Sequence, residues 1–563
     1  MTFTRASTSR FLLLSLVLAG LLIVPSPVQV RATGFSVAQQ VPTSATSFTT
    51  WPSAGQDGLG RVWLAYSNKT EGSPKNPGIW FKVWNGSAWA APKQVTSDPN
   101  QNITPVLAPL SNGSMMILWS SNRTAGNRYQ LFYKLYSGLT TKPSPTSSDI
   151  RLTTSLLNDS QPSAFQDRNG RIWVLWSRQN QTSPAGSNGV FTSDIYYKYF
   201  NGSSWSADFP LPQASNITVN GFGQTQSNPS MLQTKDGRIW TVWESNMTSD
   251  GSADLFYETT DGTLFTLPLT GIPANSWSAR KDLCCSDNNA DDGHPAIVQA
   301  RNGTIMVVWQ RCVGTNCIPD IFFMSSSDNG VTWSSPIPIP AASTTTAEFL
   351  PTAMQRNSPS DKSVWLFWQK EGLFNSEIWY TSSDQIVNVH DVGISNLVAS
   401  PRLARSGIQW DNSGLVKFNV TVTNFGDYSE NTTLTLSLNG TSLPALSVTR
   451  LALGEKRLFQ TTWQTVLPNW GRYLLTASLQ PVLGESVINQ GDNLWSGGTV
   501  RVSPPGDVDY NGCVNIYDAA QLAFAYDTTP GMPLWNPGAD VDHTGKIDIF
   551  DAAFLAFYFD KCV

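Results

Sequence analysis

The chain has 563 residues, enough for several domains, and 22 of them are Trp. Charged residues make up only 14% and the net charge is −5, so bulk electrostatics indicates no nucleic acid or other polyanionic partner. Abundant aromatic residues with few charged ones favour short β-strands joined by polar loops. The acidic residues are concentrated at the C-terminus, where the last sixty residues hold nine Asp and two Lys.

Residues 1–32 are predicted to be a secretory signal peptide. Arg5 and Arg10 precede an apolar run over residues 11–25, and Val30 and Ala32 are small residues ahead of a cleavage point. The alternative is a membrane anchor, but the run is shorter than the roughly 20 residues of a membrane span. We therefore expect a secreted or cell-surface protein with no membrane span after cleavage. Fourteen Asn-X-Ser/Thr sequons are consistent with export and glycosylation.

Six cysteines are expected to form disulfides, because an exported chain folds in an oxidising compartment. They are Cys284, Cys285, Cys312, Cys317, Cys513 and Cys562. The first four are predicted to cross-link the loop at residues 271–293 to the loop that holds Cys312 and Cys317, with their pairing left open. Zinc binding by these four thiols is the alternative. Cys513 and Cys562 are placed to join the two ends of the last domain.

Six variants of a Gly-Arg-Ile-Trp stretch occur over residues 34–390: the clearest is at residues 170–176, close variants are at 60–66 and 237–243, and looser ones are at 113–119, 303–309 and 363–368. Each copy follows an X-Pro-small step, with intervals of 53 to 67 residues between Pro52, Pro105, Pro162, Pro229, Pro295 and Pro351. Each repeat carries signals for four short antiparallel strands. Residues 33–390 are therefore predicted to form a six-bladed β-propeller. Residues 35–41 are expected to supply the missing fourth strand of the last blade, which would close the ring and remove two open sheet edges.

One turn of the propeller region carries a family resemblance. Residues 326–333 read Ser-Ser-Asp-Asn-Gly-Val-Thr-Trp, which resembles the Asp-box of sialidase-like propellers. The resemblance implies that the turn is structural and lies between the third and fourth strands, on the face opposite the family's active site. The family's arginine motif is absent, and Thr50-Trp51-Pro52 stands at the equivalent place.

Charged residues in the loops before first strands and after second strands are expected to meet on one face. A ring of cations with a few carboxylates could hold an acidic sugar, with one carboxylate as general acid or base. The alternative is that they are ordinary solvated loop charges, so enzymatic activity is left open. The candidates are Arg123, Arg178, Glu244, Asp292, Arg311 and Glu348, with Asp159, His294 and Lys370 beside them.

Residues 391–503 follow a different pattern of short alternating strands, as at residues 416–422, which predicts a β-sandwich. The Val-Thr-Val-Thr-Asn-Phe-Gly stretch with a later Asp492-Asn493 resembles the CARDB class of immunoglobulin-like modules. A spacer or adhesion role is expected, with no catalytic residues.

The tail, residues 504–563, holds two twelve-residue acidic loops at residues 507–518 and 540–551. Oxygen side chains at loop positions 1, 3, 5, 9 and 12, with Gly at position 6 and a backbone carbonyl at position 7, are the ligand pattern of Ca²⁺. Helices are predicted over residues 519–526 and 552–559. Val514 and Ile547 are expected to pair with each other in a short β-bridge. The predicted ligand residues are Asp507, Asp509, Asn511, Cys513, Asn515, Asp518, Asp540, Asp542, Thr544, Lys546, Asp548 and Asp551.

Two loop-helix units without the entering helix of an EF-hand resemble a type I dockerin. The resemblance implies two bound Ca²⁺ ions, the second held less tightly because position 5 is Thr544, and a cohesin module as partner. Loop positions 10 and 11 help to select that partner in the family, and here they are Ile516, Tyr517, Ile549 and Phe550. We expect an apolar docking face that is nearly equivalent in the two halves.

The favoured hypothesis is a secreted modular protein in a polysaccharide-catabolism or cell-surface context. Its propeller would bind a glycan or glycoprotein, with processing of that ligand left open, and its tail would dock to a cohesin-type partner. One alternative is an active glycoside hydrolase of sialidase type. Another is a structural surface protein whose propeller binds a protein.

Overall fold

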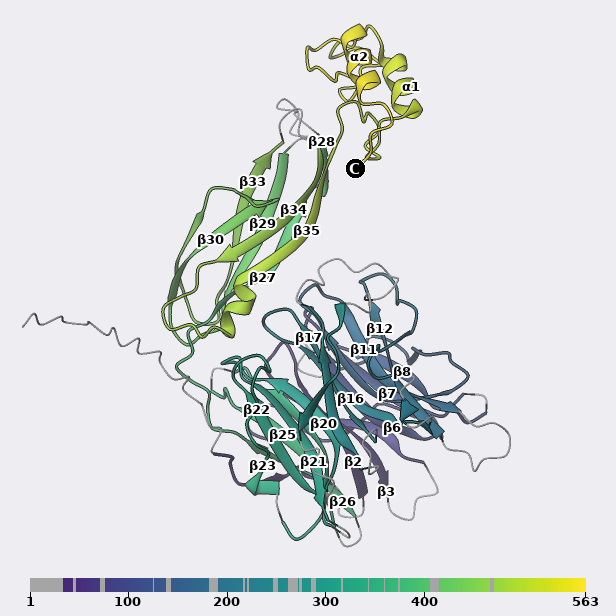
Figure 1. Ribbon diagram of the computed structural model, residues 1–563, viewed down its shortest axis with the longest axis vertical. Coiled ribbons are helices and arrows are strands. Elements are labelled where there is room, and N and C mark those ends of the chain that lie inside the picture. The colour runs from purple at the N-terminus through teal and green to yellow at the C-terminus, as the bar shows by residue number, and fades with distance from the viewer. Residues whose placement is uncertain are drawn as a thin grey trace, which may run out of the picture. The chain divides into compact units, whose positions relative to one another are not determined.

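The computed structural model is mainly β, with a small helical region at the C-terminus (Figure 1). It describes residues 34–43, 47–70, 76–124, 126–137, 143–181, 191–215, 218–219, 222–246, 252–261, 272, 276–284, 290–314, 317–342, 344–358, 360–372, 375–405, 415–465 and 470–563. Within these ranges, every helix is too short or too polar to cross a bilayer. The predicted signal peptide, residues 1–32, lies outside them.

Six antiparallel units of four strands make up most of the described chain as far as residue 383, and one parallel pair, Phe48 with Ser376, joins the first and the last unit into a single eight-stranded sheet. The first three are β2 (Ser47–Gln56), β3 (Val62–Thr70), β4 (Gly78–Trp84) and β5 (Lys93–Gln94); β6 (Asn102–Pro109), β7 (Met115–Ser121), β8 (Gln130–Tyr136) and β9 (Ile150–Arg151); and β10 (Asn158–Gln166), β11 (Ile172–Gln181), β12 (Phe191–Phe200) and β13 (Phe209–Pro210). The next two are β16 (Gln226–Gln233), β17 (Ile239–Ser245), β18 (Asp254–Thr259) and β19 (Lys281–Cys284); and β20 (Ala290–Gln299), β21 (Ile305–Val313), β22 (Asp320–Ser326) and β23 (Ile337–Pro338). The last comprises β24 (Glu348–Gln355), β25 (Val364–Glu371), β26 (Ser376–Ser382) and β1 (Gln39–Gln40). A hairpin of β14 (Thr218–Val219) and β15 (Phe222–Gly223) and the turn η2 (Pro340–Ala342) lie between sheets.

The sheets form a closed, propeller-like ring. Each first strand lies next to the first strand of the following sheet, and β24 lies next to β2. Figure 1 shows two of these neighbouring pairs, β2 with β6 and β16 with β20, in the middle of this part of the chain. As the sequence predicts, the N-terminal strand completes the last sheet, because Gln39 and Gln40 pair with Tyr380 and Trp379.

The second strands form the core of the ring. Every residue of β7 is buried, and the Trp side chains of these strands are nearly inaccessible to solvent. Trp63 of β3 packs in one apolar cluster with Met115, Ile117 and Trp119 of β7, so the clusters join neighbouring sheets. The apolar runs of the repeats are therefore buried on both faces, as their lack of alternation predicts.

In two clear copies of the repeated stretch, at residues 60–66 and 170–176, the Arg and Trp share one carboxylate acceptor. The Asp57 carboxylate accepts hydrogen bonds from Arg61 Nε at 2.8 Å and Trp63 Nε1 at 2.7 Å. Asp167 accepts the corresponding bonds in β10–β11, including one from Trp173 Nε1 at 2.8 Å. A buried indole N–H usually has such a partner, which gives a physical reason for the Arg-X-Trp spacing in these two copies. The copy at residues 237–243 differs, since Arg238 pairs with Asp236 and Trp240 Nε1 is buried without a hydrogen-bond partner.

An immunoglobulin-like sandwich follows, with a single buried core between its two sheets. One sheet contains β27 (Val392–Ser400), β29 (Leu415–Asn424) and β33 (Lys456–Gln464). The other contains β28 (Leu403–Arg405), β30 (Glu430–Leu438), β31 (Thr441–Ser442), β32 (Leu446–Leu451), β34 (Gly471–Leu479) and β35 (Leu494–Ser503), and the 3-10 turn η3 (Asn489–Asn493) precedes β35.

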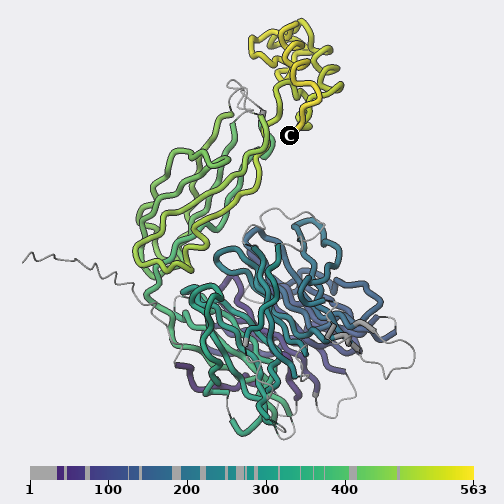
Figure 2. Tube along the Cα trace, in the orientation of Figure 1, coloured from purple at the N-terminus to yellow at the C-terminus, as the bar shows by residue number. Residues whose placement is uncertain are grey.

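The tail contains the helices α1 (Ile516–Ala525) and α2 (Ile549–Phe557). Both begin at loop position 10, three residues earlier than predicted, because the side chain at position 9 caps each helix in a reciprocal capping box. The C-terminus lies beside the first loop (Figure 2), where Cys562 is disulfide-bonded to Cys513 and Val563 N donates to Gly512 O at 2.9 Å.

The predicted bridge between Val514 and Ile547 is wrong. Ile547 N donates to Thr528 O at 3.0 Å, whereas Val514 N donates to Lys561 O at 2.9 Å. Each loop therefore pairs with the segment that follows the other loop's helix. Both apolar side chains are still completely buried, because this crossed pairing encloses them between the two halves.

The predicted cross-link of two propeller loops through Cys312 and Cys317 is also wrong. These two cysteines are bonded to each other, since they lie five residues apart after β21 with Cα atoms 5.5 Å from one another. The zinc alternative thereby loses two of its four thiols. Cys285 lies outside the described residues. The disulfides at Cys312–Cys317 and Cys513–Cys562 suggest an extracellular protein.

Candidate functional site

Three carboxylates converge in each acidic loop of the tail. Asp507, Asp509 and Asp518 in the first loop have ligand oxygens within 4.8 Å of one another, and the second loop has the same arrangement at Asp540, Asp542 and Asp551. The residue at loop position 4, Tyr510 or His543, has a positive φ of about 60° in both loops. Two independent stretches of sequence therefore fold into the same carboxylate cradle.

The hydrogen bonds that orient these carboxylates are also repeated. Asp518 Oδ1 accepts from Val508 N at 2.7 Å and Asp509 N at 3.1 Å, and its Oδ2 accepts from Asn515 N at 2.8 Å. The second-loop counterpart Asp551 accepts from the same three positions at 2.6, 3.0 and 2.8 Å. The position-1 carboxylate accepts from the glycine N–H at position 6 at 3.0 Å in both loops.

The electrostatics of the loops fit a cation. Burial, with Asp518 and Asp509 close by, raises the pKa of Asp507 to about 6. Burial also raises the pKa values of Asp540 and Asp551. Asp540 Oδ1 is buried with no hydrogen-bond partner. Carboxylate oxygens are the donors that Ca²⁺ prefers, so the residues present fit this ion.

The other predicted ligands lie around the same carboxylate cradles, and they differ in which hydrogen bonds or covalent bonds their side chains already make. Asn511 Oδ1 accepts from Cys513 N at 2.8 Å, and Thr544 Oγ1 donates to Lys546 O at 3.2 Å. Asn515 and Asp548 cap the two helices with one side-chain oxygen each. Cys513 and Lys546 can contribute only their backbone carbonyls, since one side chain is in a disulfide and the other pairs with Asp527 at 2.9 Å.

The tail presents large apolar side chains to solvent. The predicted docking residues Ile516, Tyr517, Ile549 and Phe550 are 63–70% exposed at the first turns of α1 and α2. Phe524 and Phe557, which the sequence analysis did not select, are 78% exposed. Between the helices runs an apolar groove lined by matching positions of the two halves: Ala519, Leu522, Ala523, Tyr526, Ala552, Leu555, Ala556 and Phe559.

A second candidate site lies at the X-Pro steps of the ring. The residue before each proline has a positive φ of 48–56° and coincides with a β-bulge in the first strand. Such backbone is strained for residues other than Gly and tends to persist at functional sites. The six residues are Trp51, Thr104, Gln161, Asn228, His294 and Leu350, and they line a cavity of about 240 Å³ together with the residues that follow them.

Glu244 organises one side of this cavity. Its carboxylate accepts from Asn228 Nδ2 at 2.6 Å, Ser227 Oγ at 2.7 Å and the backbone N–H of His294 at 2.7 Å. The His294 ring lies 5.5 Å from the ring of Trp51, and burial lowers the pKa of His294 while Glu244 opposes that shift. A Cβ at Gly293 would lie 2.7 Å from Glu244 Oε2, so this glycine gives the carboxylate room to approach.

The predicted ring of cations is paired with acidic residues within its own sheets. Arg178 donates to Asp159 at 2.6 Å and Asp208 at 2.7 Å, and Lys370 donates to Glu348 at 2.9 Å. The remaining pairs are Arg311 with Asp292 at 3.5 Å and Arg123 with Asp98 and Asp149 at 2.9 and 2.8 Å. Asp159, Asp292 and Glu348 are fully buried, and Asp159 and Asp292 also accept from Trp176 and Trp309. In three sheets a first-strand acid and a second-strand cation thus meet at the same end, as expected, but they bind one another: Asp159 with Arg178, Asp292 with Arg311 and Glu348 with Lys370.

The Asp-box turn lies at the other end of its sheet. Ser326 pairs with Ile305 at the start of β21, whereas Arg311 and Asp292 lie towards the far end of that strand. Asp328 accepts from Thr332 N at 2.9 Å, and a Cβ at Gly330 would lie 2.2 Å from Trp240. The turn therefore packs against the neighbouring sheet.

Comparison with known proteins identifies one module. Residues 409–482 match the CARDB family model. This match spans β29 to β34, so the sandwich contains a CARDB module. None of the curated protein sequences compared with the chain matches it.

Several solved structures are similar in fold at low identity. A Penicillium chrysogenum alpha-L-arabinanase complexed with arabinobiose is 14% identical, with a TM-score of 0.45 over 62% of this chain and 98% of that chain. A GH93 alpha-L-arabinofuranosidase of Fusarium graminearum is 12% identical, with a TM-score of 0.44 over 62% and 97%. A Trypanosoma rangeli sialidase is 10% identical, with a TM-score of 0.38 over 81% and 90%.

Of the six residues before the prolines, the sequence analysis selects His294 as a candidate and leaves out Trp51, Thr104, Gln161, Asn228 and Leu350. Each X-Pro step predicts the start of a strand. Because a residue before proline is normally extended, the sequence does not predict the positive φ at these positions. The available signal was the repetition of the step itself in six repeats.

Proposed function

We propose that this is a secreted modular protein whose tail, residues 504–563, binds two Ca²⁺ ions and docks as a dockerin-like module onto a cohesin-type partner. The observation that carries the proposal is the duplicated carboxylate cradle, with the same orienting hydrogen bonds in both loops. The propeller-like ring, residues 33–390, and the CARDB module, residues 391–503, are the parts that this tail would attach to the partner.

The docking surface would form only when calcium is bound. Three carboxylates packed within 4.8 Å repel one another, so the loops are stable in this arrangement when a cation offsets the repulsion. The last carboxylate of each loop, Asp518 or Asp551, also belongs to a helix capping box. Ion binding therefore supports the first turns of α1 and α2, where the exposed apolar residues lie.

The partner face is apolar and duplicated. Exposed aromatic and aliphatic side chains at matching positions of the two halves provide the anchors that dominate protein interfaces. Because Tyr517 and Phe550 occupy the same loop position in the two halves, either half can present equivalent anchors. The module would thus dock in either of two orientations.

The experiment is calorimetric titration of the full chain with a panel of type I cohesin modules, in calcium and in chelator. Binding should require calcium. Tyr517→Ala or Phe550→Ala alone should weaken binding by no more than about tenfold, because the other half remains, whereas the double variant should weaken it by about a hundredfold or more. Leu483→Ala, which removes a 95% exposed side chain of the CARDB module, is the matched control. Equal binding in chelator, or by the double variant, would rule the proposal out.

A second candidate function is recognition of a terminal sugar by the ring. The observation that favours it is the cavity of about 240 Å³, which is lined by the Trp51 ring, His294 and the amide side chains of Gln161 and Asn228, with Glu244 hydrogen-bonded behind Asn228 and His294. Aromatic faces and hydrogen-bonding amides suit a sugar, and the volume suits a small ligand rather than a polymer segment.

The geometry favours binding over hydrolysis. Glycoside hydrolysis generally needs two carboxylates facing the scissile bond. On this face, the buried acids Asp159 and Glu348 are held in ion pairs with Arg178 and Lys370, and they also hold the strands together. Glu244 is the acid that lies against the lining residues, and its oxygens accept three hydrogen bonds from neighbours.

A glycan array and a set of aryl glycosides, tested on the full chain, separate the possibilities. Binding that is lost in Glu244→Gln, without turnover in the wild type, supports sugar recognition. Turnover that Glu244→Gln or Glu348→Gln abolishes would establish a glycoside hydrolase. The absence of both glycan binding and turnover would favour a ring that binds a protein. Glu377→Gln, on the third strand of the last sheet, is the control for general effects of losing a carboxylate.

A further inference from the structure

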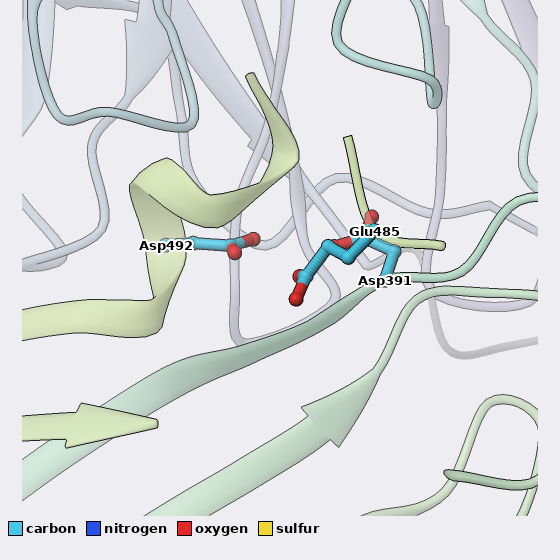
Figure 3. Close-up of side chains that lie close together, drawn as sticks. All are labelled: Asp391, Glu485 and Asp492. Atoms are coloured by element: carbon cyan, nitrogen blue, oxygen red, sulfur yellow. The ribbon is translucent and has the colours of Figure 1, made fainter. Parts of the chain in front are cut away.

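Three buried carboxylates meet in the CARDB module, away from the tail loops. Asp391 directly precedes β27, Glu485 follows β34 and Asp492 belongs to η3. Their ligand oxygens lie within 4.8 Å of one another, and Figure 3 shows the three side chains converging from separate segments. The three residues are 0%, 8% and 6% exposed. They flank, rather than fall within, the stretch that matches the CARDB family.

Several oxygens at this cluster have no hydrogen-bond partner. Glu485 is oriented by donors, because it accepts from Val482 N at 2.9 Å and from Asn493 Nδ2 at 3.0 Å. By contrast, Asp391 Oδ1, Asp492 Oδ1 and Asn493 Oδ1 are buried without a partner. Buried polar atoms are nearly always satisfied, so orphan oxygens at one place indicate a missing ligand.

The backbone leaves space for this arrangement. A Cβ at Gly393 would lie 2.5 Å from Asp492 Cγ and 2.7 Å from both of its carboxylate oxygens. Only a residue without a side chain allows Asp492 to lie against β27 and point towards Asp391. The cluster therefore depends on a specific glycine as well as on three acids.

Of the cations near the cluster, Lys235 is hydrogen-bonded to one of its acids, while Arg301, which is paired with Asp427, acts on Asp391 through space. Lys235 binds Asp391 Oδ2 and also donates to Asn489 Oδ1 at 3.1 Å, which offsets one of the three negative charges. Arg168 is close enough to act on Asp492 through space, but no hydrogen bond joins them among the contacts of the described residues. Burial, and then the charge of Asp391, raises the pKa of Asp492 to about 8, and burial raises the pKa of Asp391 to about 6.

We propose that Asp391, Glu485 and Asp492 form a third Ca²⁺ site, with the Asn493 amide oxygen as a further donor beside it. The donors are hard oxygens from three separate segments of the module, the chemistry that Ca²⁺ prefers over softer metals. The bound ion would tie the entry to β27 to the turn before β35. Because the acids belong to the CARDB module, this inference does not depend on the function of the tail.

The test counts bound ions on the full chain by equilibrium dialysis against calcium chloride. The wild type should bind three ions per chain, Asp391→Asn/Asp492→Asn two, and Asp518→Asn/Asp551→Asn, which removes one carboxylate from each tail loop, one. If the tail proposal alone fails, the wild type binds one ion and the cluster variant none. If this inference fails, the cluster variant binds as many ions as the wild type.

A stability measurement separates ion binding from a purely structural role. Calcium should raise the unfolding midpoint of the CARDB module in the wild type, and Asp492→Asn should abolish that rise. In chelator, Asp492→Asn should be at least as stable as the wild type, because it removes like-charge repulsion. A structural role would instead make this variant less stable in chelator and leave the calcium response intact, and that result would overturn the proposal. Glu455→Gln, an acid of the same module that pairs with Arg457 at the surface, is the matched control.

Discussion

At the scale of single residues, several acids of this protein are buried, and their environments differ in what they imply. Asp57 and Asp159 are completely enclosed but accept hydrogen bonds from Arg and Trp side chains, and these bonds join neighbouring parts of the ring. Glu258, in β18, is equally buried, and burial outweighs the two contacts that favour its charged form, a backbone hydrogen bond from Gln213 and the charge of Arg280. A buried carboxylate with so few donors favours its neutral form.

Glu258 predicts a pH-dependent stability. Burial raises its pKa to about 8, so the folded ring binds a proton that the unfolded chain releases above about pH 4.5. This contribution is fully present at acid pH and is lost as the pH rises through 8. Glu258→Gln should therefore stabilise the ring by more than about 1 kcal/mol at pH 8.5 and have little effect at pH 4.5.

The measurement is urea unfolding of the full chain at these two pH values, followed by tryptophan fluorescence. Glu371→Gln, which alters an exposed acid at the end of β25, is the control. A Glu258→Gln effect that does not change between the two pH values would show that this carboxyl is charged, or already paired, in the folded protein.

At the scale of elements, the turns decide how neighbouring sheets join. In the Asp-box turn, the Asp328 carboxylate accepts from Thr332 N and from Ser326 Oγ, and these hydrogen bonds lower its pKa although burial alone would raise it. The turn presents Gly330 and Trp333 to Trp240 of the preceding sheet. Loss of the carboxylate should loosen both the turn and this contact.

Asp328→Ala should destabilise the ring by about 1–3 kcal/mol, because it removes several hydrogen bonds to one charged acceptor. Asp328→Asn should cost less, since an amide oxygen can still accept from Thr332 N. Chemical unfolding of the two variants gives the ranking. If the alanine variant is as stable as the wild type, the turn contributes nothing to the packing of the two sheets.

The repeats and the loops were predictable because both express a short pattern in consecutive residues. The Gly-Arg-Ile-Trp period led to four-stranded repeats, and the spacing Asp507, Asp509, Asp518 led to a carboxylate cluster. The errors concern contacts between distant segments. Nothing in the local pattern of Val514 indicates that its partner is residue 561 rather than Ile547, because the crossed pairing depends on how the two halves pack.

The ion pairs between first and second strands show the same limit: local sequence patterns do not reveal contacts between distant segments. Arg178 and Lys370 were correctly placed at one end of their sheets, but sequence alone did not reveal that Asp159 and Glu348 would bind them. Those pairs form through the strand register, which brings Asp159 opposite Arg178. The charges that looked available for a ligand are in fact used to join first and second strands.

At the scale of the whole molecule, the N-terminal strand closes the ring. Ser36 N donates to Ser382 O and Val41 N to Ile378 O, both at 2.8 Å, and Val41 is completely buried. Without this strand, the edge of β26 would be open to solvent and to other chains.

Deleting residues 33–43 should therefore lower the unfolding midpoint of the ring and promote aggregation. A synthetic peptide of residues 33–43 added in trans should restore part of the loss, because it can pair with β26. The midpoint is measured by differential scanning calorimetry, and aggregation by light scattering. An unchanged midpoint in the truncated chain would show that the ring is closed by other contacts.

The central claim is that calcium organises the tail into its docking form, and amide hydrogen exchange on the full chain tests it most directly. In calcium, the amides of α1, α2 and the buried loop residues Val514 and Ile547 should exchange on the order of tenfold or more slowly than in chelator, because ion binding is coupled to folding of the loops. Exchange in β7, at the core of the ring, should stay the same and serves as the reference. Equal protection of the tail in calcium and in chelator would contradict the account.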